Sequence, residues 1–172
     1  MPNDIKGFNV KNKFYLYIKK GGRVKIGNNF TFYSGDCLNP LGRNLYGCIS
    51  VDENAILSIG DNVGISASTI RCRKCITIGN RVTIGADVIL LDSDGHSLDY
   101  RKRGTIDDKP KCESIKINDD VLIGTRSIIL KGVTIGSRSI IGGGSVVSKD
   151  IPSDCIAAGN PCKVIKYLNK PL

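Results

Sequence analysis

The stretch IGTRSIILKGVTIGSRSIIGGGSVVSKDIP, residues 123–152, has a regular pattern of aliphatic residues from which the fold can be predicted. A step of six residues through this stretch and its N-terminal flank meets only aliphatic side chains: Ile117, Ile123, Ile129, Ile135, Ile141 and Val147. A period of six fits neither a helix of about 3.6 residues per turn nor the two-residue alternation of a hairpin strand. It is typical of a solenoid of very short parallel strands with a sharp turn after each, so we expect an all-β, hexapeptide-repeat β-helix.

The repeat continues upstream and is then interrupted. The same six-residue step is found at Ile78, Ile84 and Leu90. From Leu90 to Ile117 the distance is 27 residues, which is three more than four repeats. A segment must therefore leave the coil between them, and we expect one protruding loop over about residues 97–113 that begins beside His96.

The length predicts a single domain, residues 1–172, because the chain can bury one core but not two full-sized ones. Ile26-Gly27 is the first dipeptide that matches the repeat, so we expect the β-helix to run over about residues 26–162. Residues 1–25 do not follow the period and are interpreted as an N-terminal cap over the open end of the solenoid. Residues 163–172 are interpreted as a C-terminal tail.

Cysteine usage and hydropathy indicate the compartment. No apolar run is long enough for a transmembrane helix, and the N-terminus has no apolar signal segment. The seven cysteines are an odd number without the spacing of a secreted disulfide framework, so we expect reduced thiols in a cytoplasmic protein. Cys72 and Cys75 form a C-x-x-C motif that could serve redox chemistry or half of a zinc site. Because no second pair and no nearby histidine accompanies them, we interpret them as small apolar side chains on a turn.

The charged residues limit the possible partners and sites. The chain has 25 Lys or Arg and 16 Asp or Glu, a formal net charge of +9, and one histidine, His96. A single histidine excludes zinc or iron sites that need two or three histidines of one chain, so we expect no metal. The aromatic residues are not interleaved with basic ones, which argues against nucleic acid as a partner. The charge is better suited to a phosphorylated small molecule or an anionic glycan.

These motifs resemble those of the hexapeptide-repeat acyltransferases over roughly residues 55–168. The similarity is densest from Ile123-Gly124 to Ile135-Gly136, through Gly142-Gly143-Gly144 to Ile151-Pro152, and on to Ala158-Gly159-Asn160-Pro161. The resemblance implies a left-handed parallel β-helix that assembles as a homotrimer with active sites between subunits. It also implies acetyl-CoA as the acetyl donor.

A narrower resemblance points to the acceptor class. The C-terminal string is similar to that of sugar O-acetyltransferases, including the maltose and galactoside enzymes. The stretch 59–66, with residues 92–99 downstream, is similar to acetyltransferases of capsule, lipopolysaccharide and exopolysaccharide biosynthesis. The resemblance therefore implies acetyl transfer to a sugar hydroxyl.

Acetyl transfer to a hydroxyl needs a base that removes the alcohol proton, and histidine is the side chain best matched to that task. His96 lies where members of this family carry the catalytic base. Asp92 and Asp94 precede it, and either could orient the imidazole; we assign this role to Asp94 and place Asp92 with the substrate contacts. The charged loop that follows is expected to help shape the acceptor pocket.

Coenzyme A carries a pyrophosphate and a 3′-phosphate, so its site needs backbone N–H groups and cations. The sugar acetyltransferase pattern implies contacts at Thr125, Gly143, Ser148, Lys149, Lys163 and Lys166. The three lysines have the charge that phosphate binding requires. Glycines 142–144 would let the pantetheine arm approach the backbone without a Cβ in the way.

The sequence departs from the family pattern on the acceptor side. Many sugar acetyltransferases have a tryptophan where this chain has Leu122, and this chain has no tryptophan. Their acceptor-contacting asparagine and acidic residue correspond here to Ser66 and Lys74, which we assign to the substrate site. Use of coenzyme A is therefore better supported than any particular sugar.

Two alternatives remain open at this point. The same fold could transfer acetyl to the amine of a nucleotide-linked amino sugar, or it could serve as a scaffold or glycan-binding module without catalysis. The γ-class carbonic anhydrases share the fold but need three metal-binding histidines, and one histidine excludes them. Nucleotidyltransferases with an acetyltransferase solenoid need a further N-terminal domain for which the chain has no room.

Overall fold

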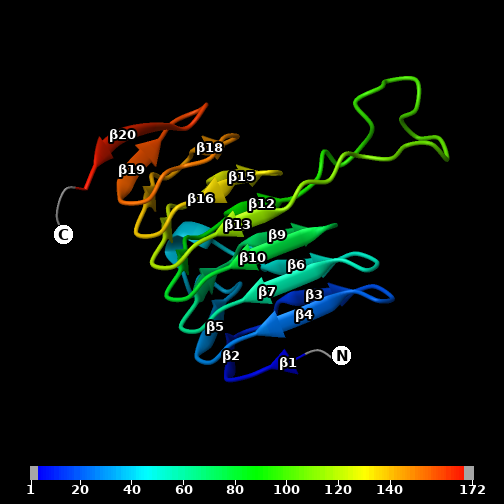
Figure 1. The fold of residues 1–172 in the computed structure, drawn as a ribbon. Helices are drawn as coiled ribbons and strands as arrows, with labels where there is room; N and C mark the ends of the chain where they lie inside the picture. The colour runs from blue at the N-terminus through cyan, green and yellow to red at the C-terminus, as the bar shows by residue number, and fades with distance from the viewer. Residues whose placement is uncertain (1–3, 169–172) are drawn as a thin grey trace.

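The computed structural model describes residues 4–168, which form a three-sided parallel β-helix (Figure 1). Face A comprises β1 (Asp4–Ile5), β4 (Arg23–Ile26), β7 (Ile56–Ile59), β10 (Cys75–Ile78), β13 (Ile115–Ile117) and β16 (Thr134–Ile135). Face B comprises β2 (Phe8–Lys11), β5 (Phe30–Tyr33), β8 (Gly64–Ser66), β11 (Thr83–Ile84), β14 (Leu122–Ile123), β17 (Ile140–Ile141), β19 (Cys155–Ala158) and β20 (Lys163–Tyr167). Face C comprises β3 (Tyr15–Ile18), β6 (Cys48–Val51), β9 (Thr69–Cys72), β12 (Ile89–Leu91), β15 (Ile128–Leu130) and β18 (Val146–Val147).

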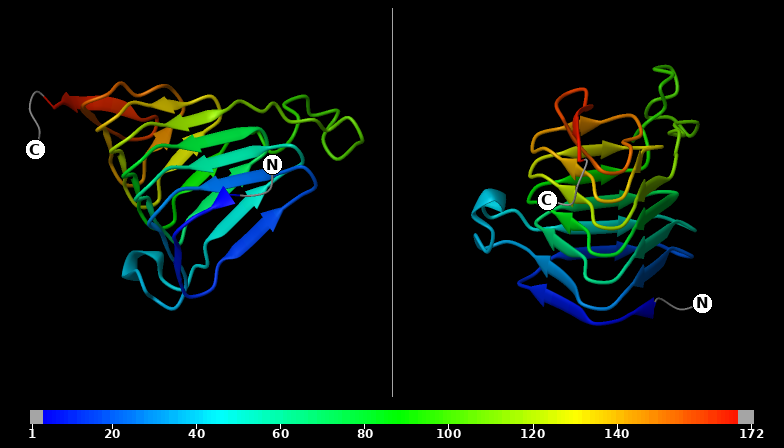
Figure 2. Two further views of the ribbon diagram at one scale, coloured as in Figure 1. Left: turned by 60° about the horizontal axis from the view of Figure 1, so that its bottom comes forward. Right: turned by 60° about the vertical axis from the view of Figure 1, so that its left-hand side comes forward.

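The six-residue ladder forms the core, as the sequence predicts. The side chains of Ile117, Ile123, Ile129, Ile135, Ile141 and Val147 are each at most 1% exposed. They stack in register from coil to coil: Ile78 lies beside Ile117, and Ile117 lies beside Ile135. Each strand of the repeat buries one or two apolar side chains inside the coil. The strands of successive coils stack in parallel along each face (Figure 2), so their backbone groups are paired.

Small residues of the repeat build the turns. Ser127 and Ser139 are buried, and each hydroxyl donates to a backbone carbonyl, Gly142 at 3.1 Å and Pro152 at 2.7 Å respectively. Gly124 has no room for a side chain, since a Cβ there would lie 2.5 Å from the backbone nitrogen of Gly143. The small residues between the aliphatic ones therefore allow successive coils to approach closely at the corners.

Residues 4–18 form the first coil, where we expected a cap over residues 1–25. Strands β1, β2 and β3 pair in parallel with β4, β5 and β6. Aromatic side chains replace the isoleucine ladder here: Phe8 stacks on Phe30 at 5.2 Å between ring centroids, and Phe14 on Phe32 at 5.0 Å. A search for aliphatic residues at a period of six misses this coil for that reason.

Two segments leave the coil. Residues 34–47 connect β5 to β6 at the corner between faces B and C and include a short 3-10 helix, η1 (Pro40–Gly42). Residues 92–114 connect β12 to β13 at the corner between faces C and A and project far from the solenoid (Figures 1 and 2). The second corresponds to the predicted loop over about residues 97–113. The six-residue period gives no sign of the first, because aromatic residues replace aliphatic ones in the coils around it.

The C-terminal strand reverses direction. β20 pairs antiparallel with β19, and Val164 packs against the hydrophobic core. The predicted tail, residues 163–172, therefore begins as a strand that adds to face B; residues 169–172 lie outside the described residues. No helix within residues 4–168 is long and apolar enough to cross a membrane.

Candidate active site

His96 lies in the 92–114 loop, at the corner between faces C and A. Its imidazole is largely exposed, with 74% of the side chain accessible, and its Nδ1 lies 2.8 Å from Oδ2 of Asp108. Asp108 comes from the returning half of the same loop, and only 11% of its side chain is accessible. The loop thus brings together a histidine and a carboxylate that are twelve residues apart.

The backbone of the loop fixes Asp108. Oδ1 accepts a hydrogen bond from the N–H of Ser97 at 2.6 Å, and Oδ2 accepts one from the N–H of Gly104 at 2.9 Å. These backbone hydrogen bonds, with the one from His96, hold the pKa of the Asp108 carboxyl well below its usual range. An ionised Asp108 selects the tautomer with the proton on Nδ1, which leaves Nε2 of His96 free to accept a proton. This is the arrangement of a general base with its orienting carboxylate.

The prediction that Asp94 orients His96 is wrong. Asp94 instead pairs with Nζ of Lys131 at 2.5 Å, because the turn before His96 directs the Asp94 carboxylate toward the next coil. Within residues 4–168, no hydrogen bond joins Asp94 to His96. Asp108 was expected only as one of several loop charges. The usable signal for it was an acidic residue in the same loop as the single histidine.

Asp92 does not serve the substrate either. The residue is fully buried, and its carboxylate accepts hydrogen bonds from the backbone N–H groups of Arg73, Lys74 and Cys75 at 2.7, 2.8 and 2.9 Å. Both oxygens are used in holding the turn between β9 and β10. The predicted acceptor contact at Asp92 is therefore wrong, because the backbone occupies the carboxylate.

The other two predicted acceptor residues lie at different corners. Lys74 is exposed in the turn between β9 and β10, at the same corner as His96. Ser66 ends β8 at the corner between faces B and C and is half-buried. Within a single chain, Lys74 therefore lies at the same corner as His96, but Ser66 does not.

The residues assigned to coenzyme A are also divided between corners. Thr125 and Gly143 lie in successive turns of the corner between faces B and C, where the N–H of Gly144 donates to the Thr125 carbonyl at 2.8 Å. Lys163 and Lys166 are exposed on β20, beside β19 on face B. Ser148 and Lys149 follow β18 at the corner between faces C and A, and both are exposed.

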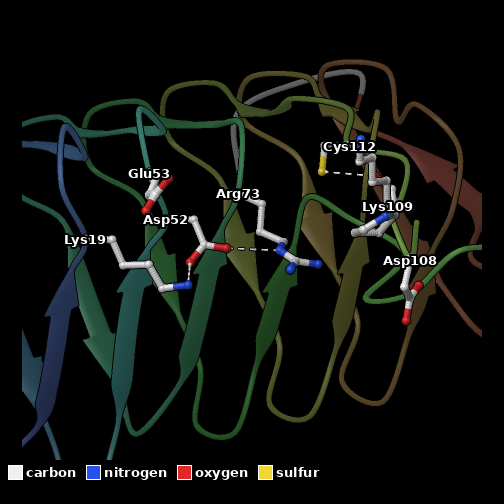
Figure 3. Close-up of a pocket in the computed structure, with 8 residues that line it drawn as sticks. Lys19, Asp52, Glu53, Arg73, Asp108, Lys109 and Cys112 are labelled. Atoms are coloured by element: carbon white, nitrogen blue, oxygen red, sulfur yellow. Dashed lines mark hydrogen bonds and ion pairs between the residues drawn. The ribbon is translucent and has the colours of Figure 1, made fainter. Parts of the chain in front are cut away.

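A pocket of about 330 Å³ opens beside the His96 loop (Figure 3). The wall of the solenoid lines one side with Lys19, Asp52, Glu53 and Arg73. The returning half of the loop lines the other side with Asp108, Lys109, Pro110 and Cys112. The carboxylate that orients His96 therefore also borders a cavity with charged walls.

The C-x-x-C pair has no site around it. Cys72 is buried, and burial together with the nearby Asp92 charge raises the pKa of its thiol to about 12. A thiol with so high a pKa is a poor nucleophile and a poor metal ligand. Within the described part of the chain, no three His, Cys, Asp or Glu side chains lie together as a metal site.

Comparisons with known proteins show which proteins the chain is similar to. Residues 114–149 match the family model described as bacterial transferase hexapeptide (six repeats). The chain is 38% identical over 128 residues to the galactoside O-acetyltransferase of Escherichia coli K12, covering 69% of this chain and 61% of that protein. It is 38% identical over 88 residues to a 2,3,4,5-tetrahydropyridine-2,6-dicarboxylate N-acetyltransferase of Staphylococcus aureus Newman, covering 51% of this chain and 31% of that protein.

A solved structure extends the similarity over the whole fold. A hexapeptide-repeat acetyltransferase of Vibrio cholerae O1 biovar eltor, complexed with acetyl coenzyme A, superposes with a TM-score of 0.57 at 26% identity, over 96% of this chain and 72% of that one. The predicted left-handed β-helix is the fold of these structural neighbours. The repeats of residues 114–149 are those of the hexapeptide-repeat transferase family, and the chain is similar to acetyltransferases with such repeats over most of its length. It spans less than two thirds of the length of the curated relatives named above.

Proposed function

We propose that the protein is an acetyl-CoA-dependent O-acetyltransferase that acts on a sugar hydroxyl in capsule, lipopolysaccharide or exopolysaccharide biosynthesis. The observation that carries the proposal is the His96–Asp108 pair, with Nδ1 held at 2.8 Å and Nε2 free at the exposed tip of the ring. We place the protein in the cytoplasm, which supplies acetyl-CoA and keeps thiols reduced. Galactoside O-acetyltransferase, a relative with this fold, is named for the same reaction on a sugar.

The proposed reaction uses His96 twice. Nε2 takes the proton of the acceptor hydroxyl as its oxygen attacks the thioester carbonyl of acetyl-CoA. The carbon–sulfur bond then breaks, and the imidazolium returns the proton to the departing coenzyme A thiolate. The negative charge of Asp108 stabilises the imidazolium between these steps. The products are the acetyl ester and coenzyme A.

The active site is proposed to form between subunits of a homotrimer. His96 lies at the corner between faces C and A, whereas Thr125 and Gly143 lie at the corner between faces B and C, so two chains would complete one site. The outward side of face C supports such an assembly, since it carries half-buried aliphatic residues: Ile89, Leu91, Ile128, Leu130 and Val146. Apart from Ile56, an exposed aliphatic exception, the outward side of face A carries mostly polar residues instead: Lys25, Ser58, Thr77, Lys116 and Thr134.

Release of free thiol from acetyl-CoA tests the proposal. Purified protein is assayed with neutral sugars, oligosaccharides of bacterial surface glycans and nucleotide-linked amino sugars, and the products are identified by mass spectrometry. His96→Ala should lower kcat at least about 100-fold, the lower end for a general base. Full activity of that variant would exclude the mechanism. The proposed function would be excluded if none of the acceptors raised thiol release above the rate measured without acceptor.

The same assay separates the main alternative. An acetyltransferase of this family in Staphylococcus aureus is named for transfer to nitrogen, and it supports an amine acceptor as a second candidate. Products stable to mild alkali would be amides, and products that hydrolyse would be esters. Binding of a glycan without any binding of acetyl-CoA would favour a scaffold or glycan-binding module.

A further inference from the structure

We infer that Arg73 is a positioning residue for His96, an assignment that rests on the proposed acetyltransferase function. Arg73 lies in the turn after β9, one coil away from the strand that leads into the loop. Its Nη1 donates to the carbonyl oxygen of Gly95 at 3.0 Å, and its Nε donates to Oδ2 of Asp52 at 3.0 Å. Gly95 directly precedes His96. Arg73 therefore joins the solenoid wall to the peptide that carries the proposed base.

The turn that carries Arg73 is itself rigidly held. Its backbone N–H donates to the buried carboxylate of Asp92 at 2.7 Å, and the next two N–H groups bind the same carboxylate. Only 27% of the Arg73 side chain is accessible. The backbone of Arg73 and the guanidinium at the end of its side chain are therefore both held by hydrogen bonds. This gives the side chain the rigidity that a positioning role requires.

Asp52 anchors the other side of Arg73 (Figure 3). Its carboxylate also binds Nζ of Lys19 at 2.8 Å and receives a two-point contact from Arg71 at 2.8 and 2.9 Å. Burial alone would raise the pKa of Asp52, but the hydrogen bonds from Lys19, Arg71 and Arg73 outweigh it and hold the pKa well below its usual range. The anchor is therefore an ionised carboxylate near neutral pH.

A second tether acts on the opposite side of the loop root. Lys131, in the turn after β15, pairs with Asp94, while Arg73, in the turn after β9, binds Gly95. On face C, β12 lies between β9 and β15. The two residues before His96 are thus held from the coil below and the coil above, which limits where the imidazole can lie.

Arg71 provides a matched control. It contacts the same carboxylate of Asp52, and its remaining hydrogen bond goes to Oγ of Ser50 at 2.7 Å, on the wall. Replacing Arg71 therefore weakens the same ion-pair cluster without touching the loop. A difference between Arg71→Gln and Arg73→Gln isolates the contact to Gly95.

The experiment compares Arg73→Gln, Arg73→Lys and Arg71→Gln in the full chain. Arg73→Gln should lower kcat by about 10- to 100-fold, as small displacements of a catalytic group do, with the KM for acetyl-CoA changed less than about two-fold. Arg71→Gln should change kcat less than about three-fold. Arg73→Lys keeps the charge and one donor, so it should recover part of the lost kcat and serves if the glutamine variant is unstable. Equal losses in both glutamine variants would overturn the assignment.

Hydrogen exchange gives a readout that does not depend on activity. Backbone amides of residues 95–108 should exchange faster in Arg73→Gln than in the wild type, and at the wild-type rate in Arg71→Gln. Unchanged exchange in Arg73→Gln would overturn the tether. A wild-type protein without acetyl transfer would refute the proposed function instead, while the exchange data would still decide whether Arg73 holds the loop.

Discussion

The wall of the β-helix and the loop at residues 92–114 are held together by different interactions. In the wall, each coil buries aliphatic side chains such as Ile129 and pairs its backbone with the next coil. In the loop, most side chains are exposed. The carboxylate of Asp108 accepts hydrogen bonds from the backbone N–H groups of Ser97 and Gly104 and contacts the imidazole of His96. We therefore expect the stability of the protein to depend on the wall and its proposed chemistry on the loop, which single substitutions can test.

The largest effect is expected in the wall. Ile129→Ala removes a fully buried side chain and leaves a cavity, so the free energy of unfolding should fall by about 2–5 kcal/mol. Ile106→Ala is the matched control, because Ile106 is 94% exposed in the loop and should change stability by less than about 0.5 kcal/mol. Denaturant unfolding followed by circular dichroism measures both. Similar losses would contradict the proposed division.

Asp92→Asn tests the junction between the two regions. The amide replaces one acceptor oxygen with a donor, so it cannot satisfy all three backbone N–H groups of the 73–75 turn. Stability should fall by about 2–3 kcal/mol, as for a lost hydrogen bond to a charged group. Asp107→Asn, at an exposed loop carboxylate, should leave the thermal midpoint unchanged. A stable Asp92→Asn variant would show that the turn does not need the charge.

Asp108→Asn should separate activity from stability. Without the negative charge, neither the tautomer of His96 protonated at Nδ1 nor its imidazolium form is stabilised. We therefore expect kcat to fall at least about ten-fold. The wall does not use this side chain, so the unfolding midpoint should stay within a few degrees of the wild type. Asp94→Asn is the comparison, since Asp94 binds Lys131 rather than His96 and should retain more activity. The reverse order would restore the original assignment of Asp94.

The smallest expected effect is on the decline of the melting temperature at low pH. The pKa values of Asp52 and Asp108 both lie below their usual range, so each carboxylate contributes stability above about pH 4 that is lost as the pH falls through its lowered folded-state pKa. Asp52 belongs to the wall, so Asp52→Asn should flatten the decline of the global melting temperature between about pH 5 and pH 2. Asp108→Asn should flatten the decline by less, because the loop can open at low pH without unfolding of the coils. If the melting temperatures of the wild type, Asp52→Asn and Asp108→Asn declined equally with pH, the proposed difference between wall and loop would be contradicted.

The sequence predicted the parts that depend on repetition. Ile123 and its equivalents repeat often enough to give the coil, and the 27-residue gap after Leu90 located the loop. The first coil was not predicted because Phe8 and Phe14 replace the aliphatic residues of the repeat. These two rings stack on aromatic rings of the next coil, and the sequence period does not show this. The loop at residues 34–47 was missed for the same reason.

The role of His96 is a proposal, and the sequence did not predict the side chains that hold this residue and the peptide before it. His96 stood out because it is the only histidine and follows a break in the repeat. Asp94 was chosen for its proximity in sequence, but the path of the loop, rather than sequence distance, decides which carboxylate reaches the ring. Arg73 gave no signal at all, since its contact to Gly95 joins residues from different coils.

By itself, then, the sequence determined the β-helix and the position of its single histidine, because a strict period of aliphatic residues can bury its side chains in only one regular way. The tertiary structure was needed to show which carboxylate contacts that histidine and which arginine contacts the peptide before it. Those contacts depend on how an irregular segment folds back on itself and on the neighbouring coil. No local pattern encodes such a path, since each hydrogen bond joins residues whose separation in sequence carries no repeat.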